Sequence, residues 1–267
     1  MNPEGAGPLA GRRIAVTRPA HQAQALSGQI EARGGIAVRF PTIAIAAAAD
    51  PAPLRAAAAE IGAYDLAVFV SANAAEHALP LLTAQGRWPG RLPAAAVGAA
   101  SARAIARFGV ARVIAPEAGE GDSEALLALP EFAPEAMRGR RVAIFRGESG
   151  RELLGETLEA RGARVTRIAC YRRLRPEIDA APLRALLAQG RLDALTVTSA
   201  EGLRNLLALL GAEAAAAAKA LPLFVVHRRI GEEARRLGFA DVVVTAPGDA
   251  GLLAALEARF AALATNG

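Results

Sequence analysis

The stretch FRGESGRELL, residues 145–154, carries two arginines and two glycines directly after an apolar run. Backbone N–H groups at the start of a helix attract anions, and the planar fork of arginine matches a carboxylate or a phosphate. We therefore predict an anion site built from Arg146, Gly147, Gly150 and Arg151. The alternative is a tight turn whose serine and glutamate cap the following helix.

Other kinds of chemistry find little support in the residues. The loop lacks the GK[ST] of a P-loop and the GxGxxG spacing with a downstream acid that marks a dinucleotide site. His21, His77 and His227 are scattered, and Cys170 is the single cysteine. We therefore expect neither a protein metal site nor an internal disulfide, and the lone thiol is typical of a reducing cytoplasm.

The chain of 267 residues is basic, with a net charge of +5 and a pI near 10.4. The excess is arginine, because Lys219 is the only lysine. A basic chain suggests nucleic acid, but these arginines are spread out and lack aromatic interleaving. A small polyanionic ligand explains the charge, and solvated arginine-rich faces are the alternative. No apolar run approaches the ~18 residues of a membrane span, and the start has no apolar signal core.

The sequence contains an internal repeat. The segment GRRIAVTRPAHQAQALSGQIEARGG begins at Gly11, and GRRVAIFRGESGRELLGETLEARGA begins 128 positions later at Gly139. The same offset separates Ser71 from Ser199, in YDLAVFVSANAAEHAL and LDALTVTSAEGLRNLL. An ordered series of matches at a nearly constant offset indicates two similar folding units.

Each unit alternates short β-branched runs with amphipathic helical stretches. The predicted strands are 13–17, 37–40, 66–70, 94–97, 112–115, 141–145, 164–168, 194–198, 223–226 and 241–245. This alternation predicts an α/β fold with parallel sheets flanked by helices. Ligands of such sheets bind beyond the carboxyl ends of the strands, where Arg18, Ser71, Ser199 and the loop at Arg146 are expected.

Several of these segments, in order, resemble the uroporphyrinogen-III synthase family. They include IAVTRP, FPTIAI, AVGAASARAIARFGV, DALTVTSAEGL and VVHRRIGEEARRLGF, and the resemblance covers roughly residues 11–260. The most telling block is FRGESGRELLGETLEARGARV followed by CYRRLRP. None of these motifs is specific by itself, but their order is.

The resemblance implies that the covalent repeat and the spatial domains are out of phase. The chain would begin in one domain, cross to the second and return. One domain would hold residues 9–38 and 177–263, and the other 46–169. Segments 39–45 and 170–176 would be linkers that form a two-stranded β-ladder, and each contains a proline beside an extended stretch.

The family's chemistry is a cyclisation without a cofactor. The implied substrate is hydroxymethylbilane, a linear tetrapyrrole with eight carboxylates, which loses water, closes and inverts its last ring through a spiro intermediate. Pyrrole electrons expel the hydroxyl group, so no metal or redox cofactor is needed. We expect a cytoplasmic monomer that binds neither nucleic acid nor membrane and contacts the preceding deaminase of the pathway transiently. The rival hypotheses are a two-domain anion sensor and a non-catalytic scaffold.

Tyr171, in CYRR, matches the linker tyrosine of the family and is the candidate general acid for the departing hydroxyl. The alternative is an aromatic that packs between domains with its hydroxyl at a wet edge. Most of the catalysis is expected from clamping the flexible bilane close to its ring-closing conformation.

The carboxylates of such a substrate need donors. The candidate arginines are Arg18, Arg146, Arg151, Arg172 and Arg229. The candidate hydroxyl and amide donors at strand-to-helix turns are Ser71, Asn73, Ser101 and Ser199, for which helix capping is the alternative. The segment HRRIGEEA departs from the family pattern, and Arg229 is expected to replace a hydroxyl contact there.

Overall fold

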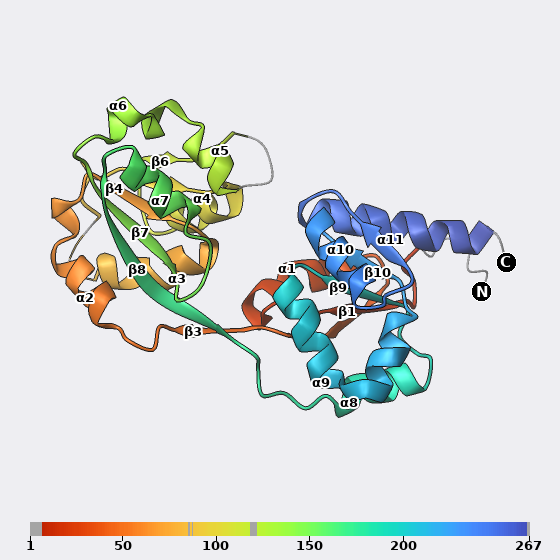
Figure 1. Ribbon diagram of the computed structural model, residues 1–267. Coiled ribbons are helices and arrows are strands. Elements are labelled where there is room, and N and C mark those ends of the chain that lie inside the picture. The colour runs from red at the N-terminus through yellow and green to blue at the C-terminus, as the bar shows by residue number, and fades with distance from the viewer. Residues whose placement is uncertain (1–6, 85, 87, 118–121, 266–267) are drawn as a thin grey trace. The chain divides into compact units, whose positions relative to one another are not determined.

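The computed structural model describes residues 7–84, 86, 88–117 and 122–265 (Figure 1). The chain divides into two compact units. Unit 1 combines Met1–Ala44 with Leu174–Gly267, and unit 2 is the continuous segment Ile45–Arg173. None of the described helices is both long enough and apolar enough to cross a bilayer.

Unit 1 contains a five-stranded parallel sheet in the order β11-β10-β9-β1-β2. Its strands are β1 (Arg13–Val16), β2 (Ile36–Arg39), β9 (Ala194–Val197), β10 (Leu223–Val225) and β11 (Val242–Val244). Its helices are α1 (Ala20–Glu31), α8 (Ala181–Ala188), α9 (Ala200–Lys219), α10 (Arg228–Arg236) and α11 (Gly248–Thr265). Successive side chains of β1 point to opposite faces of the sheet, so each face is covered by its own helices. Ile14 and Val16 pack with α1 and α11, and Ala15 packs with α8, α9 and α10.

Unit 2 contains a six-stranded sheet in the order β3-β8-β7-β4-β5-β6. Its strands are β3 (Ala44–Ala47), β4 (Leu66–Phe69), β5 (Ala94–Ala96), β6 (Val113–Ile114), β7 (Arg141–Gly147) and β8 (Arg164–Leu174). The α-helices are α2 (Ala52–Ala59), α3 (Ala72–Leu82), α4 (Ala99–Ala106), α5 (Ser123–Leu127), α6 (Pro134–Met137) and α7 (Leu153–Ala160), and the short 3₁₀ helices are η1 (Ile61–Ala63) and η2 (Pro130–Phe132).

Helices cover both faces of this second sheet. Phe69 and Phe145 stack with ring centroids 4.8 Å apart in the core beneath α2, α3 and α4. Val68 and Ile144 point to the opposite core, beneath α5, α6 and α7. The sheet is therefore buried on both faces, as its continuous apolar strands require, and polar chemistry is confined to its edges and ends.

The two sheets repeat one arrangement. In unit 1 the carboxylate of Asp193, just before β9, accepts the N–H of Arg13 at 2.7 Å. In unit 2 the carboxylate of Asp65, just before β4, accepts the N–H of Arg141 at 2.9 Å. Strands β1 and β2 come from the first sequence repeat, yet they share a sheet with β9, β10 and β11 from the second. The sequence repeat and the folded units are thus out of phase.

The predicted α/β class with helix-flanked parallel sheets is confirmed, and every predicted strand overlaps an observed one. Strand β8 includes the predicted strand 164–168 and continues to Leu174, into the segment 170–176 that the resemblance implied to be extended. Strands β3 and β8 are neighbours at the edge of the sheet. Strand β3 begins within segment 39–45, and β8 ends within segment 170–176. Their service as interdomain linkers stays a prediction, as do the domain limits that were expected from the resemblance.

Candidate functional site

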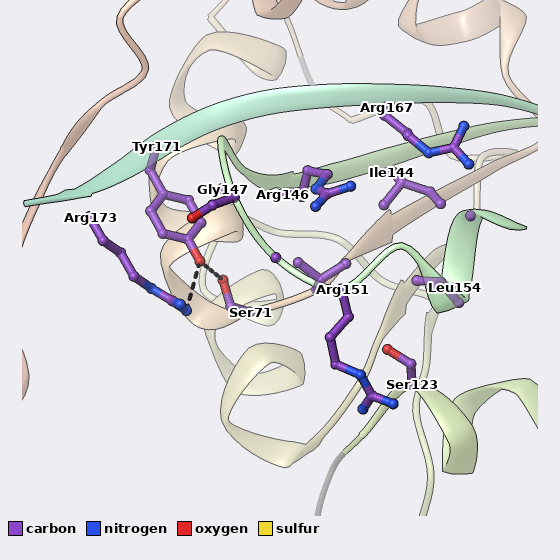
Figure 2. A pocket seen from close by; sticks show the side chains of 14 residues that line it. Ser71, Ser123, Ile144, Arg146, Gly147, Arg151, Leu154, Arg167, Tyr171 and Arg173 are labelled. Carbon is purple, nitrogen blue, oxygen red and sulfur yellow. Dashed lines mark hydrogen bonds between the residues drawn. The ribbon is translucent and has the colours of Figure 1, made fainter. Parts of the chain in front are cut away.

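A pocket of about 270 Å³ lies at the carboxyl ends of β4 and β7 in unit 2 (Figure 2). These two strands are neighbours in a parallel sheet, so the loops that follow them meet at one edge. Strand β8 forms a further wall. The lining residues are Val70, Ser71, Ser123, Ile144, Arg146, Gly147, Ser149, Gly150, Arg151, Leu154, Gly155, Arg167, Tyr171 and Arg173.

The hydroxyl of Tyr171 is the pocket's best-placed reactive group. The residue is only 2% exposed. Ser71 Oγ donates to the phenol oxygen at 3.2 Å, and Arg173 Nη2 donates to it at 3.4 Å (Figure 2). The guanidinium of Arg173 also lies 5.9 Å from the centre of the tyrosine ring. Because these two donors occupy the lone pairs of the phenol oxygen, its proton is left for a third group in the pocket.

Ser71 both caps a helix and donates a hydroxyl hydrogen bond, the two roles that its position suggested. It is the N-cap of α3, where its Oγ accepts the N–H of Ala74 at 3.1 Å. The same oxygen donates to Tyr171. The cap holds the serine side chain in one place, so helix α3 and the phenol on β8 are tied together at the end of β4.

Gly147 gives the tyrosine ring its space. The register between β7 and β8 shifts between Arg146 and Gly147, so that Gly147 stands opposite Tyr171. A Cβ at position 147 would lie 3.1 Å from Cζ of Tyr171. The N–H of Glu148 donates to the carbonyl of Tyr171 at 2.9 Å just after this irregularity. A side chain at 147 would therefore push the phenol away from its donors.

Ion pairs fix two of the arginines that line the pocket, Arg146 and Arg167. Arg146, whose side chain is 12% exposed, donates to Glu152 at 2.6 Å. Arg167 donates to the same glutamate at 3.2 Å and to both oxygens of Glu159 at 2.7 and 2.8 Å. The hydrogen bond from Arg146 holds the pKa of Glu152 below its ordinary value, and the bonds from Arg167 hold the pKa of Glu159 below its own. Glu152 therefore keeps two guanidinium groups side by side.

Arg151 stands on the opposite side of the loop. Its guanidinium forms a two-pronged ion pair with Glu124 in α5. Half of the Arg151 side chain remains exposed, at 51%. A carboxylate ligand could share this guanidinium with Glu124, since arginine has five N–H donors. The hydrogen bond with Glu124 also raises the pKa of Arg151, so the guanidinium stays charged.

Cys170 does not contribute a nucleophile to this site. The thiol is buried, and it donates to the carbonyl of Arg146 at 3.1 Å. Burial raises its pKa to about 12. Because the thiolate is the reactive form of cysteine, this thiol is inert at neutral pH. Its contribution is to attach β8 to the end of β7.

The pocket brings together half of the residues proposed from the sequence. Those that line it are Ser71, Arg146, Gly147, Gly150, Arg151 and Tyr171. Asn73 and Ser101 belong to the same unit but are buried in α3 and α4, outside the lining set. Arg172 follows Tyr171 along β8, and its buried Nε has no hydrogen-bond partner among the described residues.

The remaining candidates belong to unit 1. Arg18 is ion-paired with Asp249 at the start of α11. Ser199 caps α9, where its Oγ accepts the N–H of Gly202 at 2.9 Å, so it repeats the capping role of its counterpart in unit 2. Arg229 is exposed in the first turn of α10. Their service in substrate binding stays a prediction.

The sequence reasoning missed two arginines of the pocket, Arg167 and Arg173. Both lie on β8 at an even spacing from Tyr171, four positions before it and two after it. Residues two apart along a strand point to the same face. Once Tyr171 was proposed on an extended segment, this alternation could have indicated both arginines.

Comparisons with known proteins show which proteins this chain resembles. The family model described as "Uroporphyrinogen-III synthase HemD" matches residues 24–254. Uroporphyrinogen-III synthase of Escherichia coli is 36% identical over 261 residues, which cover 91% of this chain and 99% of that protein. The enzyme of Synechococcus elongatus is 29% identical over 74% of each chain.

Solved structures show the same fold. A mutant uroporphyrinogen III synthase from Thermus thermophilus matches with a TM-score of 0.59 at 22% identity, covering 94% of this chain and 98% of that one. The uroporphyrinogen-III synthetase of Helicobacter pylori matches with a TM-score of 0.57 at 13% identity, covering 93% and 99%. The family match extends over most of the chain and includes the arginine loop and Tyr171. The chain therefore belongs to the uroporphyrinogen-III synthase family.

Proposed function

We propose that this chain is a uroporphyrinogen-III synthase, which cyclises hydroxymethylbilane with loss of water and inversion of the terminal pyrrole ring. The observation that carries the proposal is the hydroxyl of Tyr171, which receives two hydrogen bonds in an arginine-lined pocket of a chain from this family. The reaction is that of a cyclising hydro-lyase in tetrapyrrole biosynthesis.

The first step is departure of the terminal hydroxyl group. Electrons of the pyrrole nitrogen break the C–O bond, and the electron pair leaves on oxygen. Tyr171 donates its proton to that oxygen, so that water leaves instead of hydroxide. Ser71 and Arg173 donate to the phenol oxygen, which stabilises the phenolate that forms. The proton lost when the closed ring regains aromaticity returns to Tyr171.

The second requirement is control over which carbon attacks. Attack from the already substituted position of the last ring gives the spiro intermediate, which then fragments and recloses. An uncatalysed bilane closes to the uninverted isomer, so the site must hold the chain in the less accessible geometry. Charge-assisted bonds from Arg146 and Arg151 to substrate carboxylates would supply this restraint and lower the entropy cost of closure.

The pocket accommodates part of the substrate. Its volume of about 270 Å³ is slightly below the range of ordinary ligand pockets, roughly 300–1,000 Å³. A molecule of four pyrrole rings needs further contacts, for which Arg18, Arg172, Arg229 and Ser199 remain candidates. Asn73 and Ser101 are buried and would act by supporting the turns at the sheet edge.

The segments 39–45 and 170–176 are proposed as hinged linkers between the domains 9–38 with 177–263 and 46–169. Closure of the two domains on a bilane would exclude water from the developing cation. Small-angle scattering with and without product tests this point, and a radius of gyration that does not change would contradict it. Because pyrrole electrons drive the reaction, the proposed enzyme needs neither metal nor redox cofactor, and a cytoplasmic monomer with transient access to the deaminase suffices.

The test of the function is a coupled assay that resolves isomers. Purified protein is added to porphobilinogen and its deaminase, and the porphyrins obtained after oxidation are separated into isomers I and III. The proposal requires isomer III to dominate and its rate to rise with protein concentration. Isomer I alone, at the rate seen without this chain, would leave a binding or scaffold protein as the function.

A further inference from the structure

A second polar pocket lies at the opposite edge of the sheet in unit 2. It has a volume of about 700 Å³ and is formed where β4, β5, β6 and β7 begin. Because these strands are parallel, their amino ends meet at one edge, away from the pocket at their carboxyl ends. The lining residues are Gly62, Ala63, Tyr64, Asp65, Arg91, Pro93, Arg112, Arg138, Gly139 and Arg140.

The charge of this pocket is strongly positive. Four arginines face one aspartate among the lining residues. That aspartate, Asp65, already accepts the backbone N–H of Arg141 at 2.9 Å. Within the described part of the chain, the guanidinium groups of Arg112, Arg138 and Arg140 form no ion pair. Three exposed arginines therefore line one pocket without carboxylate partners among the described residues, which leaves their guanidinium groups available to an anion.

The backbone fixes where these arginines stand. The N–H of Ala94 donates to the carbonyl of Arg112 at 3.0 Å, which places Arg112 at the first position before β6. Arg140 immediately precedes β7. The side wall is also ordered, because Arg91 Nη2 donates to the carbonyl of Gly62 at 3.1 Å and Arg141 lies 5.3 Å over the ring of Tyr64. Two of the four arginines are thus fixed directly before strands of the sheet.

Unit 1 shows that the fold does not require this charge. Its counterpart of Arg112 is Asp241, whose carbonyl accepts the N–H of Leu223 at 2.9 Å in the same way. Asp241 forms an ion pair with Arg259. Arg12, the counterpart of Arg140, pairs at 3.0 Å with Asp193. The two sheets share one architecture but differ at this edge. Among the described residues, Arg12 and Asp241 of unit 1 are ion-paired, whereas Arg112 and Arg140 of unit 2 have no carboxylate partner.

An adjoining hollow of about 450 Å³ shares Arg112 and Arg140 with this pocket. Glu131 and Pro130 also line this hollow. Within the described residues Glu131 forms no ion pair with either arginine. Arg112 and Arg140 therefore border both hollows.

We propose that this pocket binds a small multivalent anion with two or more phosphate or carboxylate groups, at a site separate from the candidate active site. Arginine forks bind both groups in bidentate fashion. The proposal is independent of the cyclisation reaction, since none of the residues involved lines the pocket around Tyr171.

Isothermal titration calorimetry at about 150 mM salt tests the site, a concentration that screens weak surface attraction. Pyrophosphate and citrate are the two probes, which separate phosphate from carboxylate recognition. The double variant Arg112→Gln with Arg140→Gln should weaken binding of the preferred probe about 10- to 100-fold, because two charge-assisted contacts are lost. If that variant does not fold, Arg138→Gln, at an exposed position, gives the same direction of change.

Two controls determine the outcome. Arg55→Gln with Arg103→Gln removes the same charge from positions of unit 2 outside the pocket, and its affinity should stay within about twofold of the wild type. Arg151→Gln should likewise retain binding. Failure of the wild type to bind either probe would overturn the proposal. Equal weakening in the control with Arg55→Gln and Arg103→Gln would also overturn it, because the probe would then be held by general charge attraction. Equal weakening in Arg151→Gln would overturn it as well, because the probe would then bind at the candidate active site.

Discussion

Gly147 and Tyr171 face each other where the register of β7 and β8 shifts, and a Cβ on Gly147 would lie 3.1 Å from Cζ of the phenol. The variant Gly147→Ala should tilt the ring slightly and lengthen its hydrogen bonds. We expect kcat for isomer III to fall about threefold to tenfold, because small displacements of an acid are costly. Gly90→Ala, at a position with open space, is the control. An unchanged kcat would mean that the ring adapts.

Tyr171→Phe tests the acid directly. Removing the phenol proton should lower kcat about 100- to 10,000-fold while KM changes little. The ring and its packing remain, so the thermal midpoint should drop only slightly through loss of the bonds from Ser71 and Arg173. Single-turnover analysis of the isomers provides the measurement. A variant that works at full speed would restrict Tyr171 to packing and leave the catalysis to restraint of the bilane.

The architecture could be predicted from the sequence because it repeats. The offset that relates Asp65 to Asp193 is also the offset between two equivalent backbone contacts, at Arg141 and Arg13. Short continuous runs of apolar and β-branched residues located the strands, since both sheets are buried on both faces. The residues of β8 did not indicate its full length, because its second half has charged residues that are typical of a loop, and only the family resemblance implied an extended segment at 170–176.

The site could be predicted only in part, for a physical reason. Residues at strand ends follow from topology, which is why Ser71 and Arg146 were expected at the pocket. Pocket residues in the middle of a strand can be predicted only when it is known which face of the strand points to the pocket. Arg167 and Arg173 on β8 were missed for this reason. The pairing of Arg146 with Glu152 depends on the course of the loop, and no sequence pattern specifies it.

Arg151→Gln should weaken substrate binding rather than the chemical step. We expect KM to rise about tenfold, because a charge-assisted contact to a substrate carboxylate is lost, with kcat nearly unchanged. Arg107→Gln is the matched control, since Arg107 is also exposed, lies in the same unit and pairs with Glu76 at 2.7 Å. Steady-state kinetics with enzymatically generated bilane provide the measurement. Equal KM values for both variants would make the loop a structural turn.

The arginine–glutamate network predicts a loss of stability in acid. Arg146 depresses the pKa of Glu152, and Arg167 depresses that of Glu159. Folded-state pKa values below the ordinary 4.5 mean that the carboxylates stabilise the fold above that pH, and that this contribution disappears as the pH falls through the lowered values.

The double variant Glu152→Gln with Glu159→Gln should therefore have a flatter acid limb in a plot of melting temperature against pH. Its difference from the wild type should be largest near neutral pH and should disappear as the pH falls below the lowered pKa values of the two carboxylates. Glu135→Gln, at an exposed position in α6, controls for the loss of a negative charge. Parallel curves for the double variant and the wild type would show that the network contributes nothing to stability.

Gly155 in α7 and Gly28 in α1 form a matched pair of helical glycines. A Cβ at Gly28 meets nothing within 4 Å, so Gly28→Ala should stabilise the protein by about 0.5 to 1 kcal/mol through helix propensity. A Cβ at Gly155 would lie 2.6 Å from Nη2 of Arg167. The guanidinium must then move away from Glu152 and Glu159, which removes ion pairs while the helix gains propensity.

Gly155→Ala should therefore gain less stability than Gly28→Ala, because loss of the ion pairs offsets part of the gain in helix propensity. It should also raise KM for the bilane, because Arg167 lines the pocket and holds Glu152 beside Arg146. Gly28→Ala should leave KM unchanged. Urea unfolding and steady-state kinetics of both variants provide the measurement. If the two variants gain equal stability with the same KM, Arg167 reaches its partners from another rotamer and the glycine is not needed for the network.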